Sequence, residues 1–192
     1  MAEQTYHRPV LLDQTIEALA IRPDGIYLDG TLGRAGHSLE IARRLTTGRL
    51  IGVDRDETAL AAAQERLAGF RDRVSLVHSN FSCIHEILDS LGLDKIDGML
   101  FDLGVSSPQL DDAQRGFSYM HDAPLDMRMD RTAALTARDV VNTWSYEELK
   151  RILANQEKLR SIFLKTALEQ RHQMFCLYAE LQIKTRQILD EV

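Results

Sequence analysis

Short apolar segments alternate with helical segments through the first half of this sequence. Strands that alternate with helices form right-handed βαβ units, which make the strands parallel and place helices on the faces of the sheet. The pattern therefore predicts an α/β fold with a Rossmann-like parallel sheet. The apolar segments lie at 25–30, 49–54, 73–80 and 96–104, and the helical patterns lie at 37–45, 57–70 and 83–92.

The chain changes character near residues 105–125. All eleven glycines lie before residue 117, and no proline follows Pro124. We expect a nucleotide-binding domain over 1–105 and part of a helical domain over 106–192, which opens with a long loop at 105–130. Helical patterns then occur at 136–142, at 145–154, where Ser145 and Glu148 form a capping-box pattern, and across much of 157–191.

Charge and composition limit the classes of function. The net charge of −6 argues against a protein that coats nucleic acid nonspecifically, but it leaves room for an enzyme that grips one RNA site through a local basic patch. The sequence shows neither a signal peptide nor an apolar run of bilayer length, so we expect a cytoplasmic chain with no membrane partner. The two cysteines and six histidines lack ligand spacing, so no metal is expected.

Three glycines follow the first predicted strand. Gly30, Gly33 and Gly36 have the spacing G-x-x-G-x-x-G, whereas the dinucleotide fingerprint is G-x-G-x-x-G. Leu32 occupies the position where a dehydrogenase needs its second glycine. An NAD-dependent dehydrogenase is therefore a weak candidate for the function of this chain. A second possibility is that the glycines form a tight turn that binds no ligand.

Two carboxylates favour a different nucleotide. Asp29 and Asp54 end the first two strands, whose carboxyl ends face one crevice in a doubly wound sheet. Asp54 can accept both hydroxyls of a ribose, and backbone N–H groups from Gly33 to His37 suit a small anion. S-adenosylmethionine fits this set, because it has a ribose, a carboxylate and a sulfonium cation but no pyrophosphate. Phe81, after the third strand, either packs on adenine or belongs to the core.

The stretch "DLGVSSPQLD" at 102–111 ends the fourth strand. Methyltransferases that act on exocyclic amines commonly carry a short polar turn with proline at this point. The N4 amine of cytosine is a poor nucleophile, and acceptors on its N–H groups can align its lone pair with the methyl group. Asp102, or the backbone around Ser106, Ser107 and Pro108, would be the catalytic group. No nucleophilic triad is visible.

Five stretches together resemble one known family. They are "HRPVLLDQTIEAL", "DGTLGRAGHS", "DRDETAL", the run from Asp97 to Asp130, and "TARDVVNTWSYEELKRIL". From residue 6 to about 154 the chain resembles the bacterial small-subunit rRNA cytosine-N4 methyltransferase H family, also called MraW. The resemblance implies S-adenosylmethionine-dependent methylation of one cytidine of the 30S subunit, with no role on DNA. It also implies cofactor contacts at Ala35, Gly36, His37, Asp54, Phe81, Asp102 and Gln109.

In this family an inserted helical lobe helps to hold the RNA. Phe117 and Tyr119 are then candidates to stack on a base, or they close the loop as hydrophobic residues. Residues 155–192 do not resemble the family, and the expected return to the last strands of the sheet is absent. A frameshift or truncation, or a divergent short member, would explain this. We therefore expect an exposed sheet edge at the fourth strand, low stability and weak or no turnover. The alternative function is that of a non-catalytic remnant, which binds cofactor or RNA without turnover.

Overall fold

The computed structural model describes residues 8–154, which fall into two compact units. The first unit runs to Asp102 and also takes in Met129–Arg131. The second unit contains Leu103–Arg128 and the described residues from Thr132 onward. The division thus comes three residues before the predicted end of the nucleotide-binding domain at residue 105.

The first unit is built on a parallel sheet of four strands in the order β3-β2-β1-β4. The predicted α/β class and its four strands are confirmed. The chain first builds outward from β1 to β3 and then crosses to the other side of β1, so a topological switch point lies between β1 and β4. Ligands of open α/β sheets bind outside the carboxyl ends of the strands at such a point. The strands are β1 (Ile26–Asp29), β2 (Arg49–Asp54), β3 (Val74–His78) and β4 (Gly98–Leu100).

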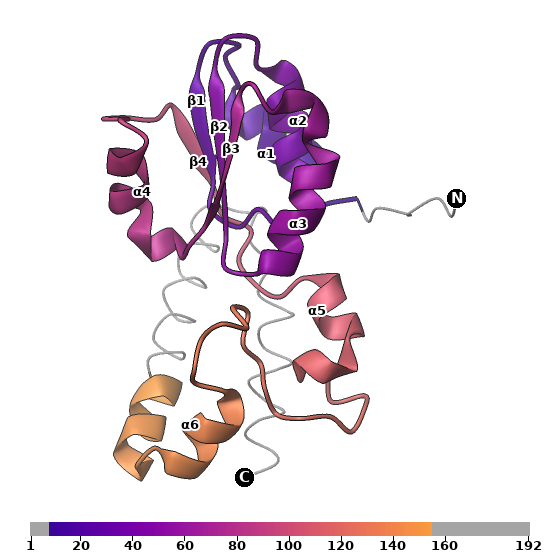
Figure 1. Cartoon of the computed structure of the whole chain (residues 1–192), viewed down its shortest axis with the longest axis vertical. Coiled ribbons are helices and arrows are strands. Elements are labelled where there is room, and N and C mark those ends of the chain that lie inside the picture. Colours follow the sequence, from indigo (N-terminus) through magenta and orange to yellow (C-terminus); the bar gives the residue numbers. More distant parts are fainter. Residues whose placement is uncertain (1–7, 155–192) are drawn as a thin grey trace. The chain divides into compact units, whose positions relative to one another are not determined.

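Helices cover both faces of this sheet (Figure 1). Three helices pack on one face, where Ile16, Tyr27 and Ile41 belong to one buried cluster. Another helix packs on the opposite face, where Leu28 and Ile87 belong to a second cluster. Neighbouring residues of β1 point to opposite faces, as the strand pleat requires, and a parallel sheet is buried on both. The helices are α1 (Leu12–Leu19), α2 (Gly36–Arg44) and α3 (Glu57–Arg66) on the first face and α4 (Ile84–Ser90) on the second.

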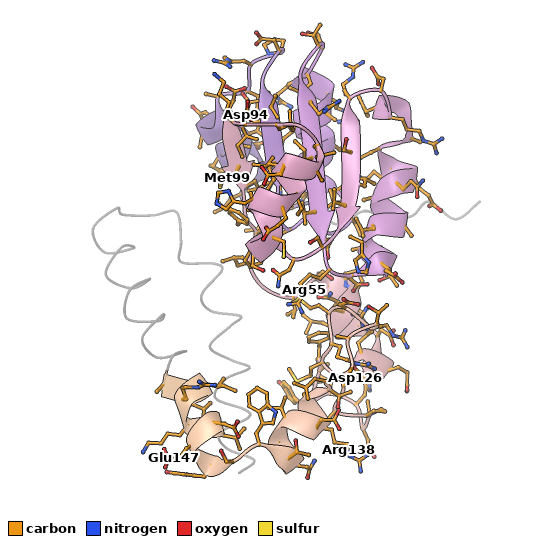
Figure 2. All side chains as sticks on the ribbon, turned by 60° about the vertical axis from the view of Figure 1, so that its left-hand side comes forward. Arg55, Asp94, Met99, Asp126, Arg138 and Glu147 are labelled. Atoms are coloured by element: carbon orange, nitrogen blue, oxygen red, sulfur yellow. The ribbon has the colours of Figure 1, made fainter. Side chains whose placement is uncertain are left out.

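The β4 strand forms one edge of the sheet within the described residues. Met99 is the register partner of Leu28 and therefore faces the same side as α4, yet 50% of its surface is exposed. Figure 2 labels Met99 on this strand. The expected exposed edge is thus present in the part of the chain that the structure describes.

The second unit contains short helices and turns. The predicted helices at 136–142 and 145–154 are confirmed as α6 (Ala137–Thr143) and as helical residues 146–154, and the Ser145 N–H donates to Glu148 Oε2 at 2.8 Å. The expected loop at 105–130 is partly wrong, because it contains α5 (Ser107–Asp111) and the 3₁₀ turn Ala113–Arg115. The predicted helix at 157–191 lies outside the described residues. In the described part, no helix is long and apolar enough to cross a membrane.

An arginine–carboxylate pair organises the middle of this second unit. The Arg128 guanidinium donates to both Asp126 carboxylate oxygens, at 2.8 and 2.6 Å, and to the Ala133 carbonyl at 2.6 Å. Such a two-pronged pair fixes a plane as well as a distance. Gly116 is required nearby, because its φ is +68° and a Cβ there would lie 2.3 Å from the Pro124 carbonyl oxygen.

Candidate functional site

The loop between β1 and α2 has a strained, tethered backbone. Gly33 and Ala35 both adopt left-handed conformations, with φ of +51° and +57°. The Gly33 N–H donates to Asp54 Oδ2 at 2.7 Å, which ties the loop to the end of β2. Ala35 is fully buried at the residue before α2, so a small side chain is needed there and glycine would relieve the strain.

Leu32 explains the unusual glycine spacing. Its side chain is buried in the core, and a Cβ on Gly52 of β2 would lie 2.8 Å from Leu32 Cδ1. The dinucleotide fingerprint uses this loop position for a glycine that lets the pyrophosphate approach the backbone. Here the same position anchors the loop to the sheet, which suits a cofactor without a pyrophosphate.

Asp54 joins two backbone segments through one carboxylate. Its Oδ2 accepts the Gly33 N–H, and its Oδ1 accepts the Asp56 N–H at 2.9 Å. Each carboxylate oxygen has a second lone pair. The half-buried Asp54 side chain can therefore hold the loop and still accept ribose hydroxyls. Its role as a ribose ligand stays a prediction.

Asp29 is a buried carboxyl beside this loop. It accepts the Ser38 hydroxyl at 2.7 Å and the Thr31 N–H at 3.2 Å. Burial raises the pKa of Asp29 from 3.8 to about 6, and the hydrogen bonds from Ser38 and Thr31 oppose that rise. His37 also lowers this pKa, whereas Asp54 raises it. The two carboxyls provide the negative charge that a sulfonium cation favours.

The first turn of α2 offers N–H groups to an anion. The first N–H groups of a helix have no acceptor within the helix, and the helix dipole favours negative charge there. Gly36 begins this helix, and a Cβ on it would lie 2.3 Å from the Pro9 side chain. The His37 ring is buried with Nε2 3.3 Å from the Val10 carbonyl oxygen. The segment before α1 therefore packs against this helix end.

Phe81 lies in the 3₁₀ turn Phe81–Cys83 after β3 and is 39% exposed. Its ring packs edge-to-face on Phe101, with centroids 5.5 Å apart and planes at 67°. A Cβ on Gly30 would lie 2.3 Å from Phe101 Cε1, so the glycine makes room for this ring. The partly exposed ring of Phe81 suits an aromatic ligand such as adenine. Phe101 was not among the residues predicted from the sequence.

The predicted catalytic stretch is divided between the units. Asp102 ends the main part of the first unit and is exposed, whereas Ser106 and the residues after it belong to the second. The expected rigid turn is in fact the start of α5, with Ser107 and Pro108 in its first turn. Gln109 is buried, and its Oε1 accepts the Ser106 N–H at 3.0 Å. The serine, proline and glutamine spacing is a capping signal that would have predicted this helix.

The two aromatic candidates of the second unit differ in exposure. Phe117 is buried, and the Arg115 guanidinium lies 5.8 Å from its ring centroid. Tyr119 is 65% exposed. In this structure Phe117 therefore closes the loop, and Tyr119 presents its ring to solvent.

Seven predicted residues belong to the first unit, at the end of β2, on the segments that follow its strands and at the start of α2. They are Gly33, Ala35, Gly36, His37, Asp54, Phe81 and Asp102. Arg55, which follows β2, and Asp94, which precedes β4, lie toward opposite ends of the sheet in Figure 2. Over residues 8–154, no three histidine, cysteine or acidic side chains are grouped closely enough to hold a metal.

Comparisons with known proteins place the sequence in a family. A family model described as the MraW methylase family matches residues 4–187. The match continues past residue 154, where the resemblance was expected to end. The ribosomal RNA small subunit methyltransferase H 2 of Agathobacter rectalis is 62% identical over 149 residues, which are 77% of this chain and 48% of that protein. The methyltransferase H of Brevibacillus brevis is 54% identical over 169 residues, covering 86% of this chain and 54% of that protein.

The chain thus spans about half the length of the curated relatives it matches. Among solved structures, a putative rRNA methylase from Clostridium thermocellum matches with 21% identity and a TM-score of 0.44, over 52% of this chain and 54% of that one. The family model covers nearly all of the sequence. The chain therefore belongs to the MraW methylase family, a family of S-adenosylmethionine-dependent rRNA methyltransferases.

Proposed function

We propose that this chain binds S-adenosylmethionine and acts in the methylation of a cytidine N4 amine in small-subunit ribosomal RNA. The main support is the Gly33–Asp54 tether, which fixes a glycine loop at the carboxyl ends of a parallel sheet. Family membership supports the reaction class. The names of the relatives, small subunit methyltransferases, support the RNA substrate.

In this proposal each part of the first unit has a separate task. Asp54 accepts the ribose hydroxyls, the first turn of α2 binds the methionine carboxylate, and Phe81 packs on the adenine. Asp29 and Asp54 supply negative charge. When bound, the cofactor supplies an electrophilic methyl group on a sulfonium. Gly33, Ala35, Gly36 and His37 shape the loop, and Gln109 stays a predicted contact.

Among the predicted catalytic groups, Asp102 fits the acceptor role best. The Ser106 carbonyl already accepts the Gln109 N–H at 2.9 Å, and the Pro108 carbonyl accepts the Asp112 N–H at 3.2 Å. Asp102 is exposed and presents a carboxylate. A carboxylate that accepts an N–H of the cytosine amine would align the nitrogen lone pair with the methyl group. We therefore assign Asp102 the orienting role. The part of Ser106, Ser107 and Pro108, which belong to the second unit, stays a prediction.

The proposed partner is the 30S subunit, and the proposed location is the cytoplasm, where that subunit is. The net charge of −6 means that RNA must be held through local basic side chains rather than through the average field of the chain. Tyr119 is a candidate to stack on an unpaired base.

The test is transfer of tritiated methyl groups from S-adenosylmethionine to unmethylated 30S subunits by the purified chain, followed by nuclease digestion and mass spectrometry. We expect N4-methylcytidine at a low level in the wild-type reaction, in keeping with the weak turnover expected from the sequence. We expect its loss with Asp102→Asn, which keeps the size of the side chain but not its charge. Label in another nucleoside, or full activity of the variant, would contradict the proposal.

Cofactor binding without turnover is the second candidate function. The half-exposed Met99 on β4 favours it, because parallel sheets are normally covered on both faces. The same assay separates the two candidates when it is combined with a cofactor titration. Saturable cofactor binding with no methylated RNA would identify a binding protein.

A further inference from the structure

Thr31 connects the loops that follow β1 and β4. Its side-chain Oγ1 accepts the Asp102 N–H at 2.6 Å, and its own N–H donates to Asp29 Oδ1 at 3.2 Å. All three residues belong to the first unit. Thr31 lies in the proposed cofactor loop, two residues before Gly33, and Asp102 carries the proposed acceptor for the amine. One hydroxyl therefore links the proposed cofactor loop to the residue that carries the proposed acceptor for the amine.

The ladder between the two strands shows why a side chain is needed here. The Gly30 N–H donates to the Leu100 carbonyl at 2.9 Å, which extends the β1–β4 pairing past Asp29. In a parallel ladder the next bond would run from the Asp102 N–H to the Gly30 carbonyl. The β1 chain turns away instead, since the Leu32 N–H donates to the Val53 carbonyl of β2 at 3.0 Å. The Thr31 hydroxyl takes the place of the lost backbone acceptor.

We propose that Thr31 is a positioning residue, whose hydroxyl holds the Asp102 backbone at a fixed place relative to the cofactor loop. This inference rests on the proposed function. Displacing a reacting group by about 1 Å can slow an enzyme by about 100-fold even when binding is little changed. Loss of the hydroxyl should therefore lower kcat more than it raises the KM for RNA or the Kd for the cofactor.

Two substitutions at Thr31 separate the hydroxyl from the volume of the side chain. Thr31→Val keeps the shape and removes the acceptor, and Thr31→Ser keeps the acceptor and removes a methyl group. Thr47→Val is the matched control, because Thr47 is an exposed threonine in the turn before β2. Thr31→Ala repeats the comparison in case the valine variant does not fold.

The first readout is exchange of the Asp102 amide hydrogen, followed by NMR on the nitrogen-15-labelled chain. We expect Thr31→Val to speed this exchange by at least about tenfold. Thr31→Ser and Thr47→Val should leave it unchanged. Equal Asp102 exchange in the wild-type chain and Thr31→Val would overturn the inference, whatever the activity.

The second readout is methyl transfer to 30S subunits with the same variants. We expect Thr31→Val to lower kcat by about 10- to 100-fold, with KM and cofactor Kd within about threefold of wild type. Thr31→Ser should restore most of the rate. An equal loss of kcat in Thr31→Val and Thr31→Ser would overturn the positioning role. A change in the cofactor Kd as large as the change in kcat would overturn it as well. No transfer by the wild-type chain would overturn the proposed function, and this role with it, while the exchange result would still decide the contact.

Discussion

Replacing Asp29 with asparagine should change how the stability of the first unit depends on pH. Burial raises the pKa of Asp29 from 3.8 to about 6, although hydrogen bonds from Ser38 and Thr31 lower it. A carboxyl with a higher pKa in the folded state binds its proton more tightly there. Its stabilising contribution is therefore complete below about pH 4 and is lost as the pH rises through about 6.

The size of this effect follows from the shift. A rise from 3.8 to about 6 corresponds to about 3 kcal/mol in the free energy of unfolding. About 2 kcal/mol of that falls between about pH 4 and pH 7. Asparagine does not ionise, and the Ser38 hydroxyl can reverse its hydrogen bond to accept from the amide. We expect Asp29→Asn to gain about 2 kcal/mol relative to wild type over this interval.

The assay is urea unfolding of both proteins at a series of pH values. The difference between them cancels carboxyls that titrate in the opposite sense, such as Glu40, whose pKa is lowered by hydrogen bonds from Arg44 and Arg43. A difference that stays constant from about pH 4 to pH 7 would refute the reasoning, because it would mean that Asp29 has the same pKa folded and unfolded.

Three substitutions test the geometry of the glycine loop by urea unfolding. Ala35→Gly should stabilise the chain by about 1 kcal/mol, because it removes the strain of a left-handed backbone at alanine, at some cost in unfolded-state entropy. A loss of stability would contradict the left-handed conformation at Ala35. Gly30→Ala should destabilise by about 1–3 kcal/mol, because its Cβ would overlap the Phe101 ring. Gly36→Ala should cost less than Gly30→Ala, because the Pro9 side chain it meets lies in the segment before α1; the reverse order would argue against this packing.

The sheet was predictable because its strands are short apolar runs between glycine turns and helices. The predicted strand at 49–54 has the bounds of β2, and Asp54 ends it as expected. The α1 helix was missed although Leu12, Ile16 and Leu19 repeat at helical spacing. Its N-cap residue, Leu11, has a left-handed backbone and makes no side-chain cap, so the usual start signal is absent.

The site was predictable only in part, for a physical reason. Asp54 ends β2 and Phe81 lies after β3, and the carboxyl ends of parallel strands meet at one edge of the sheet. Thr31 and Phe101 make contacts between segments that are 71 residues apart in sequence, such as the bond from Asp102 to Thr31, so no local pattern marks them. The roles of His37 and Gln109 came from the family resemblance, and the structure adds that both are buried.

The central claim is that the tethered glycine loop of this chain is an S-adenosylmethionine site, and calorimetric titration with the cofactor tests it most directly. The controls are Asp54→Ala at the site and Asp94→Ala, an exposed aspartate before β4 (Figure 2). We predict saturable binding that is lost in Asp54→Ala and kept in Asp94→Ala. No binding by a folded wild-type chain, or equal binding by both variants, would contradict the account.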